Sequence, residues 1–118
     1  MQESTGHATA PHDLIETVTA ARVADGDVTL WYTGGAGYIV KSAGAVIYID
    51  PFCGPSLDET WVRAIPPPFD PRDVKRCDLI LSTHEHGDHC DPHTLGPLLE
   101  GTTAPLAGPA SSMKVARD

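Results

Sequence analysis

Histidine and carboxylate side chains crowd into one short stretch of this sequence, LSTHEHGDHC at residues 81–90. Four of the six histidines of the chain lie in this stretch or just after it. In an extended segment, residues two apart point to the same side, so the imidazoles of His84 and His86 can converge on one point. Neutral imidazole is the commonest metal-binding side chain, and two at this geometry form half of a tetrahedral site.

The second part of the stretch offers two more ligands. Gly87 permits a backbone turn that other residues resist, and beyond it Asp88 and His89 present an oxygen and a nitrogen in a new direction. The stretch can therefore supply two ligands to each of two adjacent divalent metal ions. Two cations held about 3.5–4 Å apart can bridge a water, lower its pKa and polarise a carbonyl or phosphoryl oxygen. That combination is hydrolysis chemistry.

Other arrangements of these side chains are open. A lone histidine is more often a hydrogen-bonded core or surface residue than a ligand, but four around one glycine after an apolar strand favour a metal site. A helical pair, His89 with His93, is a second possibility. It is disfavoured because Asp91 and Pro92 form a helix start after His89. Cys90 is expected to pack beneath the loop rather than to bind metal.

Short strands and helices must position this cluster. Three runs rich in β-branched and aromatic residues, 28–32, 38–41 and 45–49, are bounded by glycine turns and predict an antiparallel meander. The glycine loop at 33–37 is followed by a strand rather than a helix, so a hairpin turn is favoured over a phosphate-binding loop. The run 77–83 reads as a buried strand that delivers the cluster at its carboxyl end, where α/β proteins usually place their chemistry.

Helices are expected on either side of these strands. One covers 11–22 and another begins at Pro92, although Pro97 is expected to shorten or kink it. A brief strand and a further helix follow residue 101. The proline-rich segment 52–71 is expected to be a long surface loop, in which Trp61 and Phe69 pin the loop to the core rather than line a substrate mouth. Residues 1–10 read as a disordered lead.

Composition limits the function classes. The 118 residues suit one small domain, divided here into a lead with a possible short helix, 1–24, and a partial domain, 25–118. A net charge of −8 without any basic cluster disfavours nucleic acid and favours a small-molecule substrate. Three cysteines, Cys53, Cys77 and Cys90, show no CxxC spacing and are expected to be free thiols. No signal peptide or apolar membrane span is visible, so a cytoplasmic protein is expected.

These motifs resemble a known family. THEHGDH, Thr83 to His89, matches the HxHxDH signature of the metallo-β-lactamase fold superfamily. The segments WYTGGAGYIVKS, DPFCG and DLILSTHEHGDHCDPHTL are most similar to the L-ascorbate-6-phosphate lactonase-like hydrolases. The resemblance implies an α/β fold, the N-terminal half of a four-layer αββα sandwich with a mostly antiparallel or mixed sheet and flanking helices.

The resemblance also implies roles for residues at the site. His84 and His86 would bind the first metal, and Asp88 and His89 the second. Asp50, in IDPF, resembles a position that supports the site without binding metal. Zinc is the usual metal of the superfamily, and manganese suits the lactonase-like branch. The oligomeric state is unknown.

The chain also departs from the family pattern. Family members take a further histidine, a bridging aspartate and a last histidine from later in the chain, but no histidine follows His93 here. We therefore expect a metal-dependent hydrolase in its complete form, whereas the 118 residues alone would be inactive. A metal-bridging hydroxide would attack an ester, lactone or phosphoester, and Asp88 would orient it and accept a proton. The alternatives are a non-catalytic metal-binding protein, a nuclease of the same fold, or a structural fragment.

Overall fold

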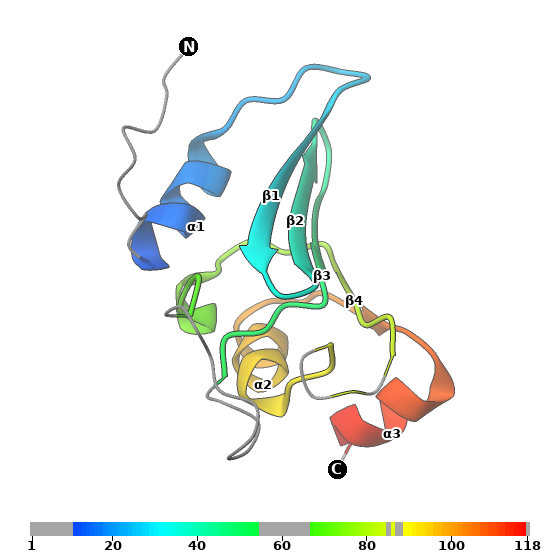
Figure 1. Cartoon of the computed structure of the whole chain (residues 1–118). Helices are drawn as coiled ribbons and strands as arrows, with labels where there is room; N and C mark the ends of the chain where they lie inside the picture. Colours follow the sequence, from blue (N-terminus) through cyan, green and yellow to red (C-terminus); the bar gives the residue numbers. More distant parts are fainter. Residues whose placement is uncertain (1–10, 55–66, 85, 87–88, 118) are drawn as a thin grey trace.

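The computed structural model describes residues 11–54, 67–84, 86 and 89–117. Its strands form one five-stranded sheet in the order β1-β2-β3-β4-β5 (Figure 1). The elements are α1 (Pro11–Ala20), β1 (Val28–Gly34), β2 (Gly37–Ser42), β3 (Val46–Ile49), the 3₁₀ helix η1 (Pro71–Asp73), β4 (Leu79–Leu81), α2 (Pro92–Gly101), β5 (Leu106–Ala107) and α3 (Ala110–Arg117).

The first three strands form the predicted antiparallel meander. β1 pairs with β2, and β2 with β3, in antiparallel register. Gly34 and Gly35 turn the first hairpin with φ angles of 96° and 59°, a region that side chains rarely adopt. The hairpin-turn interpretation of residues 33–37 is therefore confirmed.

The last two strands run parallel to β3. β4 pairs with β3 so that Ile49 faces Leu81, and β5 pairs with β4 so that Leu81 faces Ala107. The sheet is thus mixed, as the family resemblance implied. Because parallel neighbours end at the same edge of a sheet, the segments that follow β3, β4 and β5 all leave from one edge.

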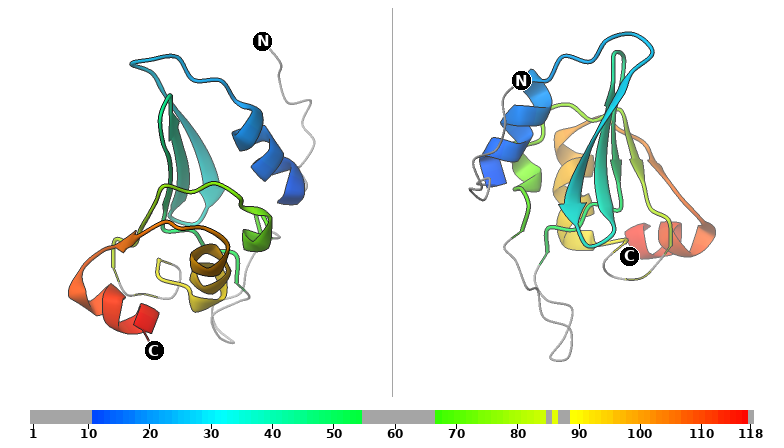
Figure 2. Two further views of the ribbon diagram at one scale, coloured as in Figure 1. Left: turned by 180° about the vertical axis from the view of Figure 1, so that it is seen from behind. Right: turned by 45° about the horizontal axis from the view of Figure 1, so that its top comes forward.

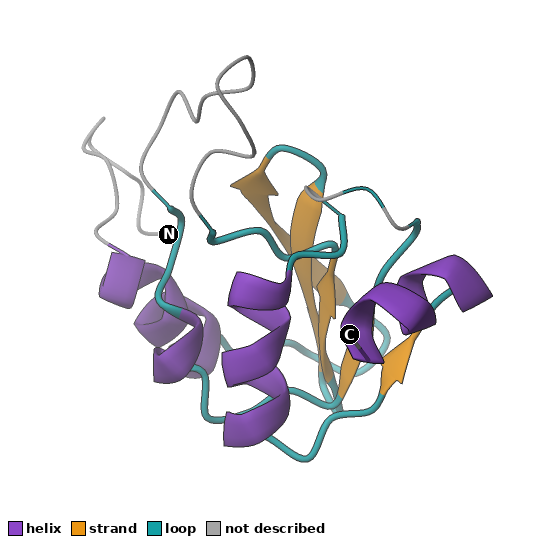
Figure 3. Ribbon diagram, turned by 90° about the horizontal axis from the view of Figure 1, so that it is seen from below, coloured by secondary structure: helices purple, strands orange, loops and turns teal. Residues whose placement is uncertain are grey.

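One face of the sheet carries the core. Ile39, Tyr48 and Ile80 are fully buried on it, under apolar side chains of α1 and α2 that include Ile15 and Leu98. Figures 2 and 3 show these two helices on the same side of the strands. Hydrophobic burial against this face is the main source of stability for such a layered domain.

Phe69 anchors the end of the long loop to this core. Its ring lies 5.6 Å from that of Tyr48 in an edge-on arrangement, and it is 1% exposed. The expectation that Phe69 pins the loop is confirmed. Trp61, and with it most of the 52–71 loop, lies outside the described residues, as do residues 1–10.

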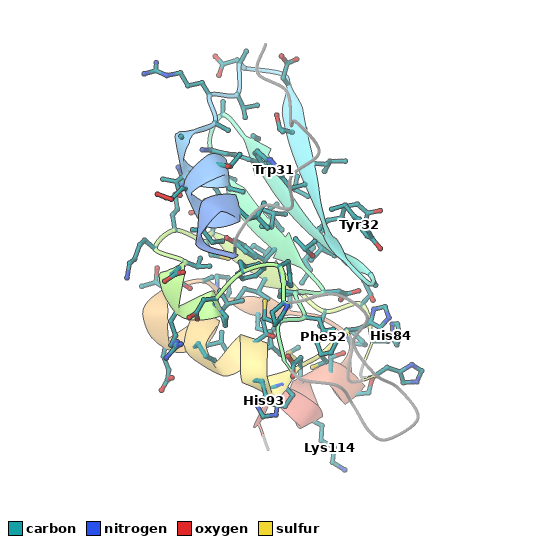
Figure 4. The ribbon with its side chains drawn as sticks, turned by 60° about the vertical axis from the view of Figure 1, so that its left-hand side comes forward. Trp31, Tyr32, Phe52, His84, His93 and Lys114 are labelled. Carbon is teal, nitrogen blue, oxygen red and sulfur yellow. The ribbon has the colours of Figure 1, made fainter. Side chains whose placement is uncertain are left out.

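The opposite face of β1 and β2 is apolar but exposed. Leu30 is 60% and Tyr32 62% exposed, and Val28 and Tyr38 on the same face are also accessible. The rings of Tyr32 and Tyr38 pair with centroids 5.3 Å apart. Figure 4 shows Trp31 on the helix side of β1 and Tyr32 on the other side. One face of the sheet is therefore covered by helices, and the other presents apolar side chains to solvent.

The helices agree with the sequence except at Pro97. α2 begins after Asp91, as predicted, and continues through Pro97 to Gly101, so Pro97 does not shorten it, and the alternative of a kink stays a prediction. Proline removes a helical hydrogen bond. The buried side chains of Leu95 and Leu98 nevertheless hold both flanking turns against the core. Within the described residues, no helix is long and apolar enough to span a membrane.

Candidate functional site

Parallel pairing of β3 and β4 places Asp50 beside Thr83. Each residue follows the end of its strand, and the Asp50 amide donates to the Leu81 carbonyl over 2.8 Å. Asp50 adopts the left-handed conformation, with φ of 47°, the only described non-glycine residue with positive φ. Aspartate tolerates this region better than most residues. The backbone of Asp50 therefore turns at the position where its carboxylate contacts Thr83, which follows β4.

The buried carboxylate of Asp50 ties the histidine stretch to the sheet. One oxygen accepts from the Thr83 amide at 2.8 Å. The other accepts from the Thr83 hydroxyl at 2.6 Å and lies 2.7 Å from Nδ1 of His89. Asp50 is only 2% exposed, and a buried carboxylate is costly unless it is hydrogen-bonded, so these contacts stabilise it in the interior. The sequence resemblance assigned Asp50 a supporting position, and its bond to His89 is the contact that such a role requires.

Three of the predicted ligands lie together. The rings of His84 and His86 have centroids 4.6 Å apart, and those of His84 and His89 are 3.7 Å apart. Nδ1 of His84 is 3.1 Å from the Thr83 hydroxyl. The amide of His89 donates to the His86 carbonyl, which turns the chain back between them. The three imidazoles therefore lie close together, and Asp88 lies outside the described residues.

His93 and Cys90 do not join the histidine rings. His93 is exposed in the first turn of α2, and its amide donates to the Asp91 carboxylate. Figure 4 shows it apart from His84. Cys90 is 1% exposed within the core, which confirms that it packs beneath the loop. All three cysteines are free, with Cys77 buried and Cys53 half-buried, as predicted.

The donor set suits a divalent metal ion, but the described side chains alone do not form a complete site. Among the residues that the structure describes, no group of three or more His, Cys, Asp or Glu side chains is arranged to hold an ion. The imidazoles lie ring against ring instead. Protein groups contact Nδ1 of both His84 and His89, so Nε2 is the nitrogen that each would present to a metal. A carboxylate on the opposite ring nitrogen is the usual support of a metal-binding histidine.

A second carboxylate, Asp91, holds the segment after β3 against α2. It accepts from the amides of Gly54 and His93 and from the Thr94 hydroxyl, and Thr94 in turn accepts from the Cys53 amide. The sequence predicted that Asp91 caps α2, but it did not predict the hydrogen bonds that Asp91 and Thr94 accept from the amides of residues 53 and 54. It also missed Thr83, whose only signal was a hydroxyl directly before the first histidine.

Comparison with known proteins agrees with this architecture. A family model described as a beta-lactamase superfamily domain matches residues 29–115. Two curated relatives, each a probable L-ascorbate-6-phosphate lactonase, are similar to this chain. The relative from Escherichia coli O45:K1 is 25% identical over 121 residues, which cover 81% of this chain and 34% of the relative. The relative from Salmonella paratyphi B is 24% identical over the same shares.

The chain belongs to the beta-lactamase superfamily, as most of its length matches that family model. Its resemblance to the lactonase-like hydrolases is likewise confirmed. The chain spans about a third of the length of the curated relatives it matches, 34%. Members of this superfamily usually bind divalent metals, which agrees with the nature of the histidine cluster.

Proposed function

We propose that the complete protein is a metal-dependent hydrolase in which His84, His86, Asp88 and His89 bind two divalent metal ions. The observation that carries this proposal is the 2.7 Å contact between the buried Asp50 carboxylate and Nδ1 of His89, within a cluster of three imidazoles. A metal-binding histidine usually has such a support, because the carboxylate fixes the ring and makes its other nitrogen more basic.

The residues of this chain would each perform a defined task. Asp50 orients His89, and the Thr83 hydroxyl connects Asp50 to His84. Asp88, by its place in the motif, would bind metal, orient the nucleophile and accept its proton. When bound, the metals would supply an activated water and polarise the bond to be cleaved.

The substrate class follows from the relatives by analogy. Both relatives are named as probable L-ascorbate-6-phosphate lactonases. We therefore propose a small-molecule lactone, ester or phosphoester. Zinc is the first candidate metal, and manganese the second, because histidine and carboxylate ligands accept both.

We propose that the complete protein extends beyond these 118 residues. The domain at 25–118 would contribute four of the seven metal ligands expected for the family, and we propose that the other three, with a second sheet, come from outside these residues. The exposed apolar face of β1 and β2 supports this, since a second sheet packed on it would complete a four-layer sandwich. Residues 1–24 would serve as a lead whose helix, α1, covers the other face.

Metal content tests the ligand assignment directly. We would measure bound zinc and manganese per chain by mass spectrometry for the wild type, His86→Ala and His93→Ala. His86→Ala should lose metal, while His93→Ala should retain it because His93 is exposed in α2. Equal metal content in all three proteins would refute the assignment. In the complete protein, turnover of nucleic acid but not of lactones would favour a nuclease, and metal binding without any turnover would favour the non-catalytic alternative.

A further inference from the structure

Two buried serine hydroxyls meet at the base of the histidine stretch. Ser82, directly after β4, is 3% exposed, and Ser112 in α3 is 0% exposed. Their hydroxyl oxygens are 3.0 Å apart. Residues 30 positions apart in the chain are thus joined by a polar contact within the protein interior, where hydrogen bonds are strong and unsatisfied groups are costly.

The Ser82 hydroxyl also contacts both ends of the loop that holds the histidines. Its oxygen lies 3.0 Å from the His84 carbonyl oxygen and 3.1 Å from that of His89. Carbonyl oxygens can only accept, and a serine hydroxyl has one proton. The single Ser82 proton is free to serve the two carbonyls when the Ser112 hydroxyl donates to Ser82, and in that arrangement all four groups form one network.

A close approach of backbones brings α3 to this position. The Ser82 amide donates to the Ala107 carbonyl at the end of β5, and Gly108 follows. A Cβ at position 108 would lie 2.6 Å from the Ser82 carbonyl oxygen, so only glycine fits there. The Cys90 thiol lies 3.5 Å from the Ser112 carbonyl, which gives α3 a second contact with the end of the histidine stretch.

We propose that Ser82 and Ser112 are positioning residues that fix the backbones of His84 and His89 relative to each other. Through this pair of serines, called the serine clamp, α3 would fix the backbone of His84, a ligand of the first proposed metal, relative to that of His89, a ligand of the second. The inference rests on the proposed function for its effect on metal binding, but its effect on the loop does not depend on metal. Neither serine reaches the ring nitrogens, so both act through the histidine backbones.

Amide hydrogen exchange in the metal-free 118-residue chain tests the clamp. The amides of His89 and Cys90, which both donate to the His86 carbonyl, report the order of the loop. Ser82→Ala should make them exchange roughly tenfold faster, and Ser112→Ala should accelerate them less, because that variant leaves the Ser82 bonds in place. In parallel, zinc affinity should fall about tenfold in Ser82→Ala.

Ser42→Ala is the matched control. The Ser42 hydroxyl likewise contacts two backbone groups, here accepting from the amides of Gly44 and Ala45, but at the end of β2 away from the site. This variant should lose stability without changing exchange at His89 or zinc affinity. The double variant of Ser82 and Ser112 should resemble Ser82→Ala alone, because Ser112 acts only through Ser82.

The outcomes separate the clamp from the proposed function. Unchanged exchange at His89 and Cys90 in both single variants would overturn the clamp. Faster exchange in a chain that never binds zinc would still support the clamp, and it would count against the metal site only if the complete protein also fails to bind zinc. Zinc binding that is unaffected by either variant would overturn the positioning role, whatever the exchange rates. If Ser82→Ala does not fold, Ser112→Ala gives the same tests with a smaller expected change.

Discussion

Asp50 combines a left-handed backbone with a buried charge, and each property can be tested separately. Asparagine tolerates the same φ and nearly preserves the shape of the side chain, but it removes the charge that faces Nδ1 of His89. We predict that Asp50→Asn weakens metal binding about 10- to 100-fold while the fold is retained. Zinc titration alongside urea unfolding measures both effects.

Asp50→Ala is the companion variant. It also removes the two hydrogen bonds from Thr83, so it should destabilise the fold by about 2–3 kcal/mol beyond its effect on metal. Wild-type zinc affinity in Asp50→Asn would show that the charge of Asp50 does not orient His89.

Cys77 makes stability depend on pH in the alkaline range. Burial raises the pKa of its thiol from 9.0 to about 11, and it likewise raises the pKa of the Tyr48 hydroxyl. A raised pKa in the folded state contributes stability below the pKa of the unfolded thiol. That contribution is lost as pH rises from about 9 towards 11.

The free energy of unfolding should therefore decrease over this interval, and Cys77→Ala should lose less of it than the wild type. Urea titrations at about pH 8 and about pH 10.5 make the comparison. Parallel losses in the two proteins would assign the effect to other groups.

At the scale of single residues, the sequence predicted the ligand types but not all of their partners. His84, His86 and His89 could be identified because their spacing matches the geometry of extended and turned backbone. The contacts of Thr83 and Ser82 could not, because each depends on a strand or helix more than 20 positions away. Hydroxyl side chains are common in loops, and their partners become evident only in the folded chain.

At the scale of elements, α2 depends on Asp91 for more than its first turn. The buried carboxylate accepts from the amide of His93 and the hydroxyl of Thr94 in the helix, and also from the amide of Gly54. We predict that Asp91→Ala costs about 2–4 kcal/mol of unfolding free energy and loosens residues 51–54. Asp70→Ala is the control, since Asp70 caps η1 on the exposed surface and should cost little. Urea unfolding of both variants checks the difference, and equal costs would contradict the bridging role of Asp91.

The pairing of the strands could be predicted from sequence patterns only in part. The meander was predictable because short glycine-bounded runs leave room only for hairpins. The parallel pairing of β3, β4 and β5 was not, because β4 and β5 span three and two residues and offer no periodicity of their own. This pairing brings Asp50 to Thr83, so the supporting half of the site follows from topology rather than from a local motif.

At the scale of the whole molecule, the sheet has two unlike faces. Helices cover one, and the other presents Val28, Leu30 and Tyr32 to solvent. Exposed apolar surfaces of this kind usually mark a contact with another layer or partner. The sequence alone did not distinguish the faces of β1, because Trp31 and its neighbours on both sides are apolar or aromatic.

The paired rings of Tyr32 and Tyr38 give this bare face an optical signal of its own. Two phenol rings 5.3 Å apart and tilted by 51° form a coupled chromophore, and the Tyr32 hydroxyl is held by the Gly35 carbonyl. Any sheet or partner that packs against this face of β1 and β2 must change the environment of the two rings. Near-ultraviolet circular dichroism could therefore detect the binding of such a layer without an attached label, because the tyrosine pair itself reports on this face.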